Sequence, residues 1–177
     1  MTEMEPAARP PGRPGSSQES PRLLLRPLPW AAVRAIAEGS RLDGWAADYP
    51  AEGDLVIAGL LHRAGPAAWA EDDGVWGHRQ VVERASGAVV GGIGFSGPPD
   101  EGEVEVGYGI VPSRRGRGYA TEAVQSMVSM AWADPAVTAV AASTDVGNVA
   151  SQRVLEKAGF RRVAATGEFR YRLDRPS

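Results

Sequence analysis

Hydrophobic and polar positions alternate along residues 103–111 with a period of two, which is typical of a strand with one buried face. One face is apolar and the other carries glutamates and glycines; the two sets are Val104, Val106, Tyr108 and Ile110, and Glu103, Glu105, Gly107 and Gly109. Further along, the period becomes helical, with an apolar side formed by Ala120, Ala123, Val124, Met127, Val128 and Ala131. The pattern therefore predicts a strand, a glycine-rich turn and an amphipathic helix.

The same criteria predict the remaining elements of the chain. Strands are expected at residues 22–26, 76–84, 88–95, 137–144, 160–163 and 169–173. Helices are expected at residues 30–38, 54–63, 118 onward and 148–158. The order β-α-α-β-β-β-α-β-α-β-β indicates an α/β protein of the mixed α+β kind, in which helices flank both faces of a mixed sheet.

The N-terminal segment differs from the rest in composition. Residues 1–20 are rich in Pro, Gly, Ser and Glu and hold hardly any apolar mass, so we expect a disordered tail there. The remaining segment, residues 21–177, has the size of one domain that can bury a core without disulfides. We therefore predict a single folded domain at residues 21–177.

Composition narrows the chemistry that the chain can perform. Its 177 residues include no cysteine and only two histidines, His62 and His78, which are too far apart in sequence for metal-ligand spacing. These counts exclude disulfides and a cysteine nucleophile, and we expect no metal. A net charge of −3 argues against a nucleic-acid partner. No apolar run reaches the length of a membrane span and no signal peptide is visible, so we expect a cytoplasmic protein without a membrane partner.

The segment PSRRGRGYATEA, at residues 112–123, joins the predicted strand to the predicted helix. A helix N-terminus presents unpaired N–H groups and the positive end of the helix dipole, so it attracts phosphate. Its two glycines allow close approach to the backbone, and positive charge is added by Arg114, Arg115 and Arg117. The segment indicates an anion site, although solvated arginines on a plain glycine loop would give the same pattern.

Two familiar phosphate motifs do not account for this site. The chain contains no G-x-x-x-x-G-K-[ST] sequence, which excludes a P-loop. Residues 92–97 match G-x-G-x-x-G, but they lie late in a predicted strand and run into Pro98 and Pro99 instead of a helix. Because the dinucleotide fingerprint requires strand, turn and helix, we interpret this match as coincidental.

A second motif cluster completes a resemblance to a known family. Residues 115–120 fit the R-x-x-G-x-A cofactor signature of the GNAT acyltransferases. The chain is similar to the ribosomal-protein (Rim-type) N-acetyltransferase subgroup in its motifs E-V-G-Y, A-T-E-A, N-x-x-S and E-K-x-G-F, at residues 105–108, 120–123, 148–151 and 156–160. The resemblance extends from about residue 22 to the C-terminus and is weakest over residues 30–74.

This resemblance implies the GNAT fold, with a central twisted mixed sheet of about six or seven strands, and an acetyl-CoA site between two diverging strands at 103–111 and 137–144. The residues implied in cofactor binding are Ile110, Val111, Arg115, Gly116, Arg117, Gly118, Tyr119, Ala120, Thr121, Asn148 and Ser151. The diphosphate would bind N–H groups of residues 115–120, and the pantetheine arm would pair with the strand backbone at Ile110 and Val111. Asn148 would bond the pantetheine amide, or it would simply cap its helix.

The resemblance also implies direct attack of a primary amine on the acetyl-CoA thioester, without a covalent enzyme intermediate. A strand N–H near Ile110 would stabilise the oxyanion. Glu105 is the candidate base, directly or through water, because it shares a face with Gly107 and Gly109. Glu103 shares that face as the fallback, and either glutamate could instead be an ordinary exposed carboxylate.

The candidate acid departs from the broad family pattern. Many members carry a tyrosine where this chain has Leu155, which leaves the Ser151 hydroxyl as the candidate acid or as a group that orients a water. The acceptor pocket is the part that the sequence describes least. Residues that could line it, or equally pack the core, are Trp45, Asp48, Tyr49, Trp69, Trp76 and His78.

The acceptor implied is a primary amine, either a peptide or protein N-terminus or a small molecule. An α-amine is roughly 10–20% neutral at pH 7, whereas a lysine is neutral below about 0.1%, so an enzyme without a strong base favours α-amines. Two alternatives stay open, namely a catalytically silent acyl-CoA-binding module and a transferase that uses a different acyl-CoA. The sequence is compatible with a monomer or a homodimer.

Overall fold

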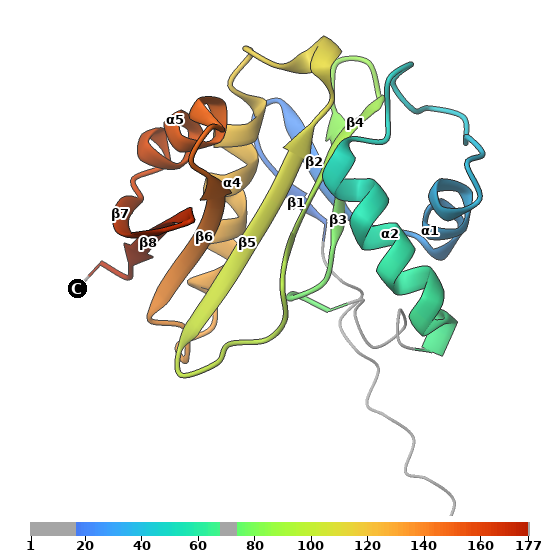
Figure 1. The fold of residues 1–177 in the computed structure, drawn as a ribbon. Coiled ribbons are helices and arrows are strands. Elements are labelled where there is room, and N and C mark those ends of the chain that lie inside the picture. The colour runs from blue at the N-terminus through green and yellow to red at the C-terminus, as the bar shows by residue number, and fades with distance from the viewer. Residues whose placement is uncertain (1–16, 68–73, 177) are drawn as a thin grey trace, which may run out of the picture.

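The computed structural model of the chain describes residues 17–67 and 74–176 (Figure 1). Its strands are β1 (Gln18–Glu19), β2 (Leu23–Pro27), β3 (Arg79–Glu83), β4 (Val89–Phe95), β5 (Glu103–Ile110), β6 (Ala139–Asp145), β7 (Arg161–Thr166) and β8 (Glu168–Asp174). Within the described residues they form one eight-stranded sheet in the order β1-β2-β3-β4-β5-β6-β8-β7. Neighbouring strands are antiparallel except β5 and β6, which are parallel.

Helices lie on both faces of this sheet, as predicted. They are α1 (Trp30–Ala37), α2 (Glu52–Ala64), the short 3₁₀ helix η1 (Pro112–Arg114), α4 (Tyr119–Ala131) and α5 (Val149–Lys157). In Figure 1, α1 and α2 lie together on one side of the sheet, and α4 lies behind it and packs against α5. From β2 onward the predicted order of elements is confirmed, and the mixed α/β class with it.

The alternation of residues 103–111 is realised in β5. Val104, Val106 and Ile110 are buried in the core, at most 7% exposed. On the opposite face Gly107 is exposed and Glu105 is half-buried. Because side chains of a strand point alternately to its two faces, β5 contributes one face to the core and leaves the other accessible.

The expected strand at residues 76–84 is shorter in the structure. β3 begins only at Arg79, because Gly77 donates its N–H to the carbonyl of Gly74 in a turn. Trp76 lies in that turn and packs edge-on against Phe95, with ring centroids 5.4 Å apart. Trp76 therefore belongs to the turn before β3 and not to the strand that was expected at residues 76–84.

The predicted disorder of residues 1–20 is wrong at the C-terminal end of that segment. β1 pairs with β2, and the Ser20 hydroxyl donates to the Glu122 carboxylate on α4 over 2.7 Å. A sheet edge offers backbone partners to any extended segment, a signal that composition does not carry. This additional strand explains why the sheet has eight strands instead of six or seven. Residues 1–16 of the predicted tail lie outside the described residues.

The position of the site is set by the way β5 and β6 part. They pair only over Glu103–Glu105 and Ala139–Ala141. Beyond these pairs, β5 continues alongside β4 and β6 continues alongside β8 (Figure 1). The predicted divergence of the two strands is confirmed, and it leaves the edge of β5 from Val106 to Ile110 without a strand partner on that side.

In the described ranges of the chain, every helix is too short or too polar to cross a bilayer. The same residues contain no group of three or more His, Cys, Asp and Glu side chains that could hold a metal ion.

Candidate active site

The turn between η1 and α4 carries the predicted anion site. Gly116 and Gly118 have φ angles of 73° and 79°, a left-handed conformation that favours glycine. The N–H groups from Gly116 to Thr121 donate to no acceptor in the described part of the chain, and Glu122 is the first to bond back, to the Gly118 carbonyl over 3.1 Å. A row of unpaired donors at a helix N-terminus is the arrangement that binds phosphate.

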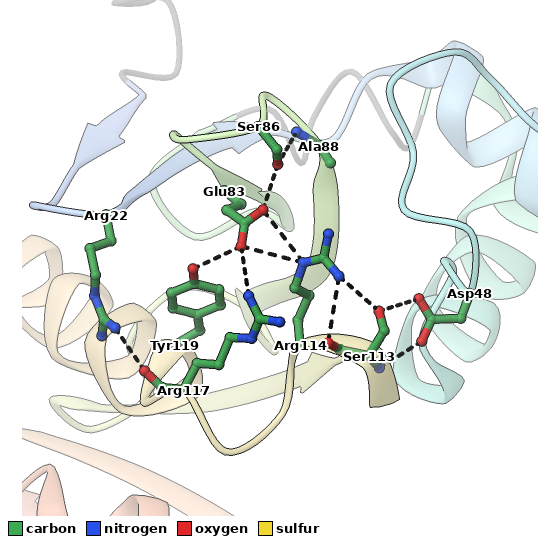
Figure 2. A network of polar contacts seen from close by, with 9 residues as sticks. All are labelled: Arg22, Asp48, Glu83, Ser86, Ala88, Ser113, Arg114, Arg117 and Tyr119. Carbon is green, nitrogen blue, oxygen red and sulfur yellow. Dashed lines mark hydrogen bonds and ion pairs between the residues drawn. The ribbon is translucent and has the colours of Figure 1, made fainter.

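The three arginines of this turn bond to the protein itself. Arg114 Nε lies 3.3 Å and Arg117 NH1 3.7 Å from Glu83 Oε1. Figure 2 shows both guanidinium groups turned toward this carboxylate. Arg115 Nε donates to the Ile110 carbonyl over 2.9 Å. Two of the three charges that the sequence assigned to the anion site therefore face a carboxylate. The arginines brace the turn, while its backbone N–H groups remain available.

Glu83, at the end of β3, is the centre of this network (Figure 2). It is 5% exposed and accepts hydrogen bonds from the hydroxyls of Ser86, over 2.5 Å, and Tyr119, over 2.8 Å. The bonds from Ser86 and Tyr119, together with the charge of Arg114, hold the pKa of Glu83 below its usual range. Sequence reasoning missed this residue, because a glutamate at the end of a predicted strand gives no sign of its partners 31 and 36 positions away.

A second contact ties the turn to the segment before α2. The backbone N–H and the hydroxyl of Ser113 donate to the two carboxylate oxygens of Asp48, over 2.8 Å and 2.7 Å (Figure 2). These two bonds lower the pKa of Asp48. Asp48 was a candidate to line the acceptor pocket, and its carboxylate instead holds η1 in place.

Two hydroxyl groups meet near the point where β5 and β6 part. Tyr108 Oη on β5 and Ser151 Oγ on α5 are 2.8 Å apart. Burial raises the pKa of Tyr108 to about 12, so its hydroxyl keeps its proton at neutral pH. Leu155, at the position where many family members carry a tyrosine, is fully buried. Sequence reasoning assigned Tyr108 only to the apolar face of its strand and missed its pairing with Ser151.

Asn148 precedes α5 and caps it. Its side-chain oxygen accepts the N–H of Ser151 over 3.0 Å. The capping alternative is therefore confirmed, and the side-chain NH₂ group of Asn148 is left to bind a ligand amide.

The two candidate bases differ in their partners on β8. Glu103 pairs with Arg170 and, over 2.5 Å, with Arg172, so its charge is committed to two arginines. Among the residues that the structure describes, Glu105 forms an ion pair only with Arg170, at 3.7 Å, and its side chain is 38% exposed. Both glutamates line a cavity of about 450 Å³. Glu105 remains the better candidate, because it keeps an accessible carboxylate on the open face of β5.

The remaining candidates for the acceptor pocket are mostly structural. Trp45 and Tyr49 belong to the core and pack edge to face, with ring centroids 4.9 Å apart. Trp76 packs against the core from its turn, as described above. Trp69 lies outside the described residues.

Comparison with protein families identifies the chain. The family described as "Acetyltransferase (GNAT) domain" matches residues 22–161. The chain belongs to the GNAT acetyltransferase family. The resemblance that the motifs predict is confirmed, because the matched region includes the diverging strands, the glycine turn and α5.

Individual relatives of this GNAT chain add detail. It is 38% identical over 81 residues to the uncharacterized N-acetyltransferase YjdG of Bacillus subtilis. The aligned region covers 45% of this chain and 48% of YjdG. The chain therefore spans about half the length of this curated relative.

Two solved structures resemble the chain along nearly its whole length. A putative ribosomal-protein-serine acetyltransferase from Vibrio cholerae has a TM-score of 0.66 and 18% identity, covering 92% of this chain and 99% of that one. An aminoglycoside acetyltransferase, AAC(6')-Ib in complex with coenzyme A, has a TM-score of 0.60 and 20% identity, covering 86% and 95%. At these identities the likeness shows the fold alone, and it confirms the predicted GNAT fold.

Proposed function

We propose that this GNAT protein is an acetyl-CoA-dependent N-acetyltransferase that acts on a primary amine, either a peptide or protein N-terminus or a small molecule. The observation that carries this proposal is the row of unpaired N–H groups from Gly116 to Thr121, next to the unpaired edge of β5. A diphosphate fits the first feature, and an extended amide-containing arm fits the second.

The residues around this edge fit acetyl-CoA. Val111 donates its N–H to Val90 on β4, so the N–H of the preceding residue, Ile110, points to the opposite side, toward the gap between β5 and β6. The side-chain NH₂ of Asn148 and the gap-facing backbone of β5 near Ile110 would hold the arm, and the N–H groups of residues 116–121 the diphosphate. The N–H groups of Val111 and Arg115, which the sequence also assigned to the cofactor, are already bonded to Val90 and Pro112. When bound, acetyl-CoA supplies an acetyl group activated as a thioester.

The side chains supply the proton transfers of the proposed reaction. The amine nitrogen bonds to the acetyl carbon as the carbon–sulfur bond breaks. Glu105 receives the amine proton, directly or through a water molecule, and the Tyr108–Ser151 hydroxyl pair donates a proton to the departing thiolate. A strand N–H near Ile110, on the side of β5 that faces the gap, stabilises the negative charge that develops on the acetyl oxygen.

The acceptor preferred by this site is an α-amine or another weakly basic primary amine. A lysine ammonium has a pKa about 2.5 units above that of an α-amine, so removing its proton costs about 3.5 kcal/mol more. A single half-buried carboxylate such as Glu105 supplies little driving force against that difference.

Mass spectrometry of pooled peptides and small amines after incubation with acetyl-CoA tests this function. We expect acetylated products that depend on enzyme and on acetyl-CoA. Binding of acetyl-CoA without turnover of any amine would favour the silent acyl-CoA-binding module. Turnover with succinyl-CoA but not with acetyl-CoA would assign a different acyl donor.

A further inference from the structure

A carboxyl group that the proposed reaction does not use lies under the first turn of α2. Asp54 Oδ2 accepts the N–H of Ala51 over 3.0 Å and so caps the helix. No group in the described residues donates a hydrogen bond to its other oxygen, Oδ1. This oxygen lies directly over Gly92, where an added Cβ would be only 1.8 Å away. Asp54 therefore rests on the sheet surface with one oxygen available.

The sheet beneath Asp54 carries four glycines, which we name the glycine floor. Gly92 pairs with Gly109, and Gly94 pairs with Gly107. Cross-strand partners point to the same face, and residues two apart in a strand do as well, so all four belong to one face. This is the face of Glu105, since Glu105, Gly107 and Gly109 alternate with the core positions of β5.

The glycine floor is covered at three positions and open at the fourth. Asp54 lies over Gly92, the His78 ring lies over Gly94, and the Ala51 side chain approaches Gly109. A Cβ added at Gly107 would meet no atom within 4 Å, and Gly107 is exposed. A ligand group therefore has direct access to the backbone at Gly107, diagonally across the floor from Asp54.

Two buried polar atoms near Asp54 are poorly satisfied within the protein. The Tyr49 hydroxyl and Gln80 Nε2 form no well-directed hydrogen bond in the described residues, although both side chains are 1% exposed. Burial first, and then the charge of Asp54, raise the pKa of Tyr49, while the nearby Gln80 amide opposes this rise. Gln80 lies opposite Gly92 in the register of β3 and β4. Such atoms cost stability unless a ligand or water satisfies them, so they indicate a polar site.

We propose that Asp54 is a specificity-determining residue that binds the amino group of the acceptor above the open side of the glycine floor. This inference rests on the proposed function and names the residue that recognises its substrate. A carboxylate oxygen without a protein donor accepts N–H groups and favours a cation by charge. The bare backbone of the floor leaves room for the carbon that bears the amine.

The ionisation of Asp54 gives this recognition a pH dependence. Burial raises the pKa of Asp54 to about 7, while the Ala51 N–H and the charge of His78 oppose that shift. The titratable groups that face it are His78, just before β3, and Tyr49, in the segment before α2, and Arg26 on β2 acts on Tyr49. As pH rises through about 7, Asp54 becomes charged and acceptor binding strengthens.

Carboxyl-carbon NMR of the full chain tests the binding directly, with propylammonium chloride as the probe. The signal of Asp54 is assigned from its loss in Asp54→Asn. We expect propylammonium to lower the pKa of Asp54, because a bound cation favours the carboxylate. Tetramethylammonium chloride, which has no N–H group, is the control for ionic strength and should leave the pKa unchanged. An equal pKa with both salts would overturn the proposal, whether or not the protein turns over an amine.

Kinetics with an acceptor found by mass spectrometry give the second readout. Asp54→Asn keeps an oxygen for the Ala51 N–H but loses the charge, so we expect the acceptor KM to rise about 10- to 100-fold and to lose its pH dependence near 7. Gly107→Ala adds a methyl group to the open floor without a clash and should also raise the acceptor KM. Gly53→Ala, on the exposed side of α2 with no atom within 4 Å of the added Cβ, is the matched control and should change nothing.

Acetyl-CoA affinity separates the two possible failures. If Asp54→Asn binds acetyl-CoA like the unaltered protein and keeps its acceptor KM, the role of Asp54 is wrong and the proposed function stands. If the unaltered protein binds no acetyl-CoA, the proposed function is wrong, and the NMR titration alone decides whether Asp54 binds an amine.

Discussion

The substitution Glu83→Gln distinguishes two roles for the arginines of the glycine turn: they either brace the turn or bind the diphosphate directly. In the structure, Arg114 and Arg117 face the buried carboxylate of Glu83, and the Tyr119 hydroxyl donates to it (Figure 2). Glutamine has nearly the same shape but no charge, and its NH₂ group cannot accept the bonds that one carboxylate oxygen accepts. The substitution therefore weakens the brace without creating a cavity.

The size of the effect follows from the contacts of Glu83. A hydrogen bond to a charged group contributes about 1.5–3 kcal/mol and a neutral one about 0.5–1.5 kcal/mol. Of the bonds from Ser86 and Tyr119, the one that keeps an oxygen acceptor therefore loses about 1 kcal/mol, and the one that meets the NH₂ group loses about 2 kcal/mol. The Glu83 side chain is only 7% exposed, so solvent screens these bonds little. Arg117 is 51% exposed, and its ion pair adds little. We expect the free energy of unfolding to fall by about 3 kcal/mol.

Urea denaturation and calorimetric titration with acetyl-CoA measure the two consequences. A loosened turn spends less time in the conformation that aligns its N–H groups, so we expect the Kd for acetyl-CoA to rise several-fold. Glu168→Gln, at an exposed position at the start of β8, is the matched control and should change neither quantity.

One outcome would refute this reasoning. If stability falls while acetyl-CoA binds as tightly as before, or more tightly, the released arginines contact the diphosphate directly. The brace would then not support cofactor binding, and Arg114 and Arg117 would serve as anion ligands, as their sequence first indicates.

Three further predictions concern the gap, the sheet and the acid limit of stability. Tyr108→Phe removes the hydroxyl that bonds Ser151. We expect kcat to fall about 100-fold or more in a thiol-release assay, while the Kd for acetyl-CoA stays the same. An unchanged kcat would exclude the role of Tyr108 as proton donor. Gly91→Ala places a Cβ 2.1 Å from the Gly109 carbonyl oxygen, so unfolding should become easier by about 3 kcal/mol, and a wild-type urea midpoint would contradict the β4–β5 register. Hydrogen bonds from Ser86 and Tyr119 lower the pKa of Glu83 below its ordinary 4.5. The carboxylate therefore contributes fully to stability above pH 4.5, and this contribution is lost as the pH falls through the lowered pKa. In urea titrations at acid pH, the stability of Glu83→Gln should fall less steeply with pH than that of the unaltered protein.

The segment from β5 to α4 is the part of the fold that the sequence predicts best. There the strand period, the glycines and the helical period follow one another within thirty residues, so each local signal supports the next. The resemblance carried by the motifs assigns Ile110, Asn148 and Ser151 to the cofactor. In the structure Ile110 ends the edge of β5 that lacks a strand partner, and Ser151 contacts Tyr108 of the same strand, while their role in cofactor binding stays a prediction.

Contacts between distant segments could not be predicted in the same way. Glu83 meets Tyr119, and Tyr108 meets Ser151, through pairings of strands and helices that no local pattern encodes. Asp54 was read only as the start of a helix, and its contact with Gly92 depends on how α2 lies on the sheet. The glycines of the coincidental G-x-G-x-x-G match have their physical reason there, because Asp54 and His78 occupy the space above Gly92 and Gly94.

The two hydrogen bonds between Asp48 and Ser113 join the segment that leads into α2 to the 3₁₀ helix that leads into the glycine turn. Under the functions proposed above, acetyl-CoA binds at the glycine turn and the acceptor binds next to α2, and these two hydrogen bonds connect the two regions. If bound acetyl-CoA changes the affinity for the acceptor by some factor, thermodynamic reciprocity requires that the bound acceptor changes the affinity for acetyl-CoA by the same factor. Under the proposed function, this link predicts that acetyl-CoA and the acceptor strengthen each other's binding by the same factor, whichever binds first.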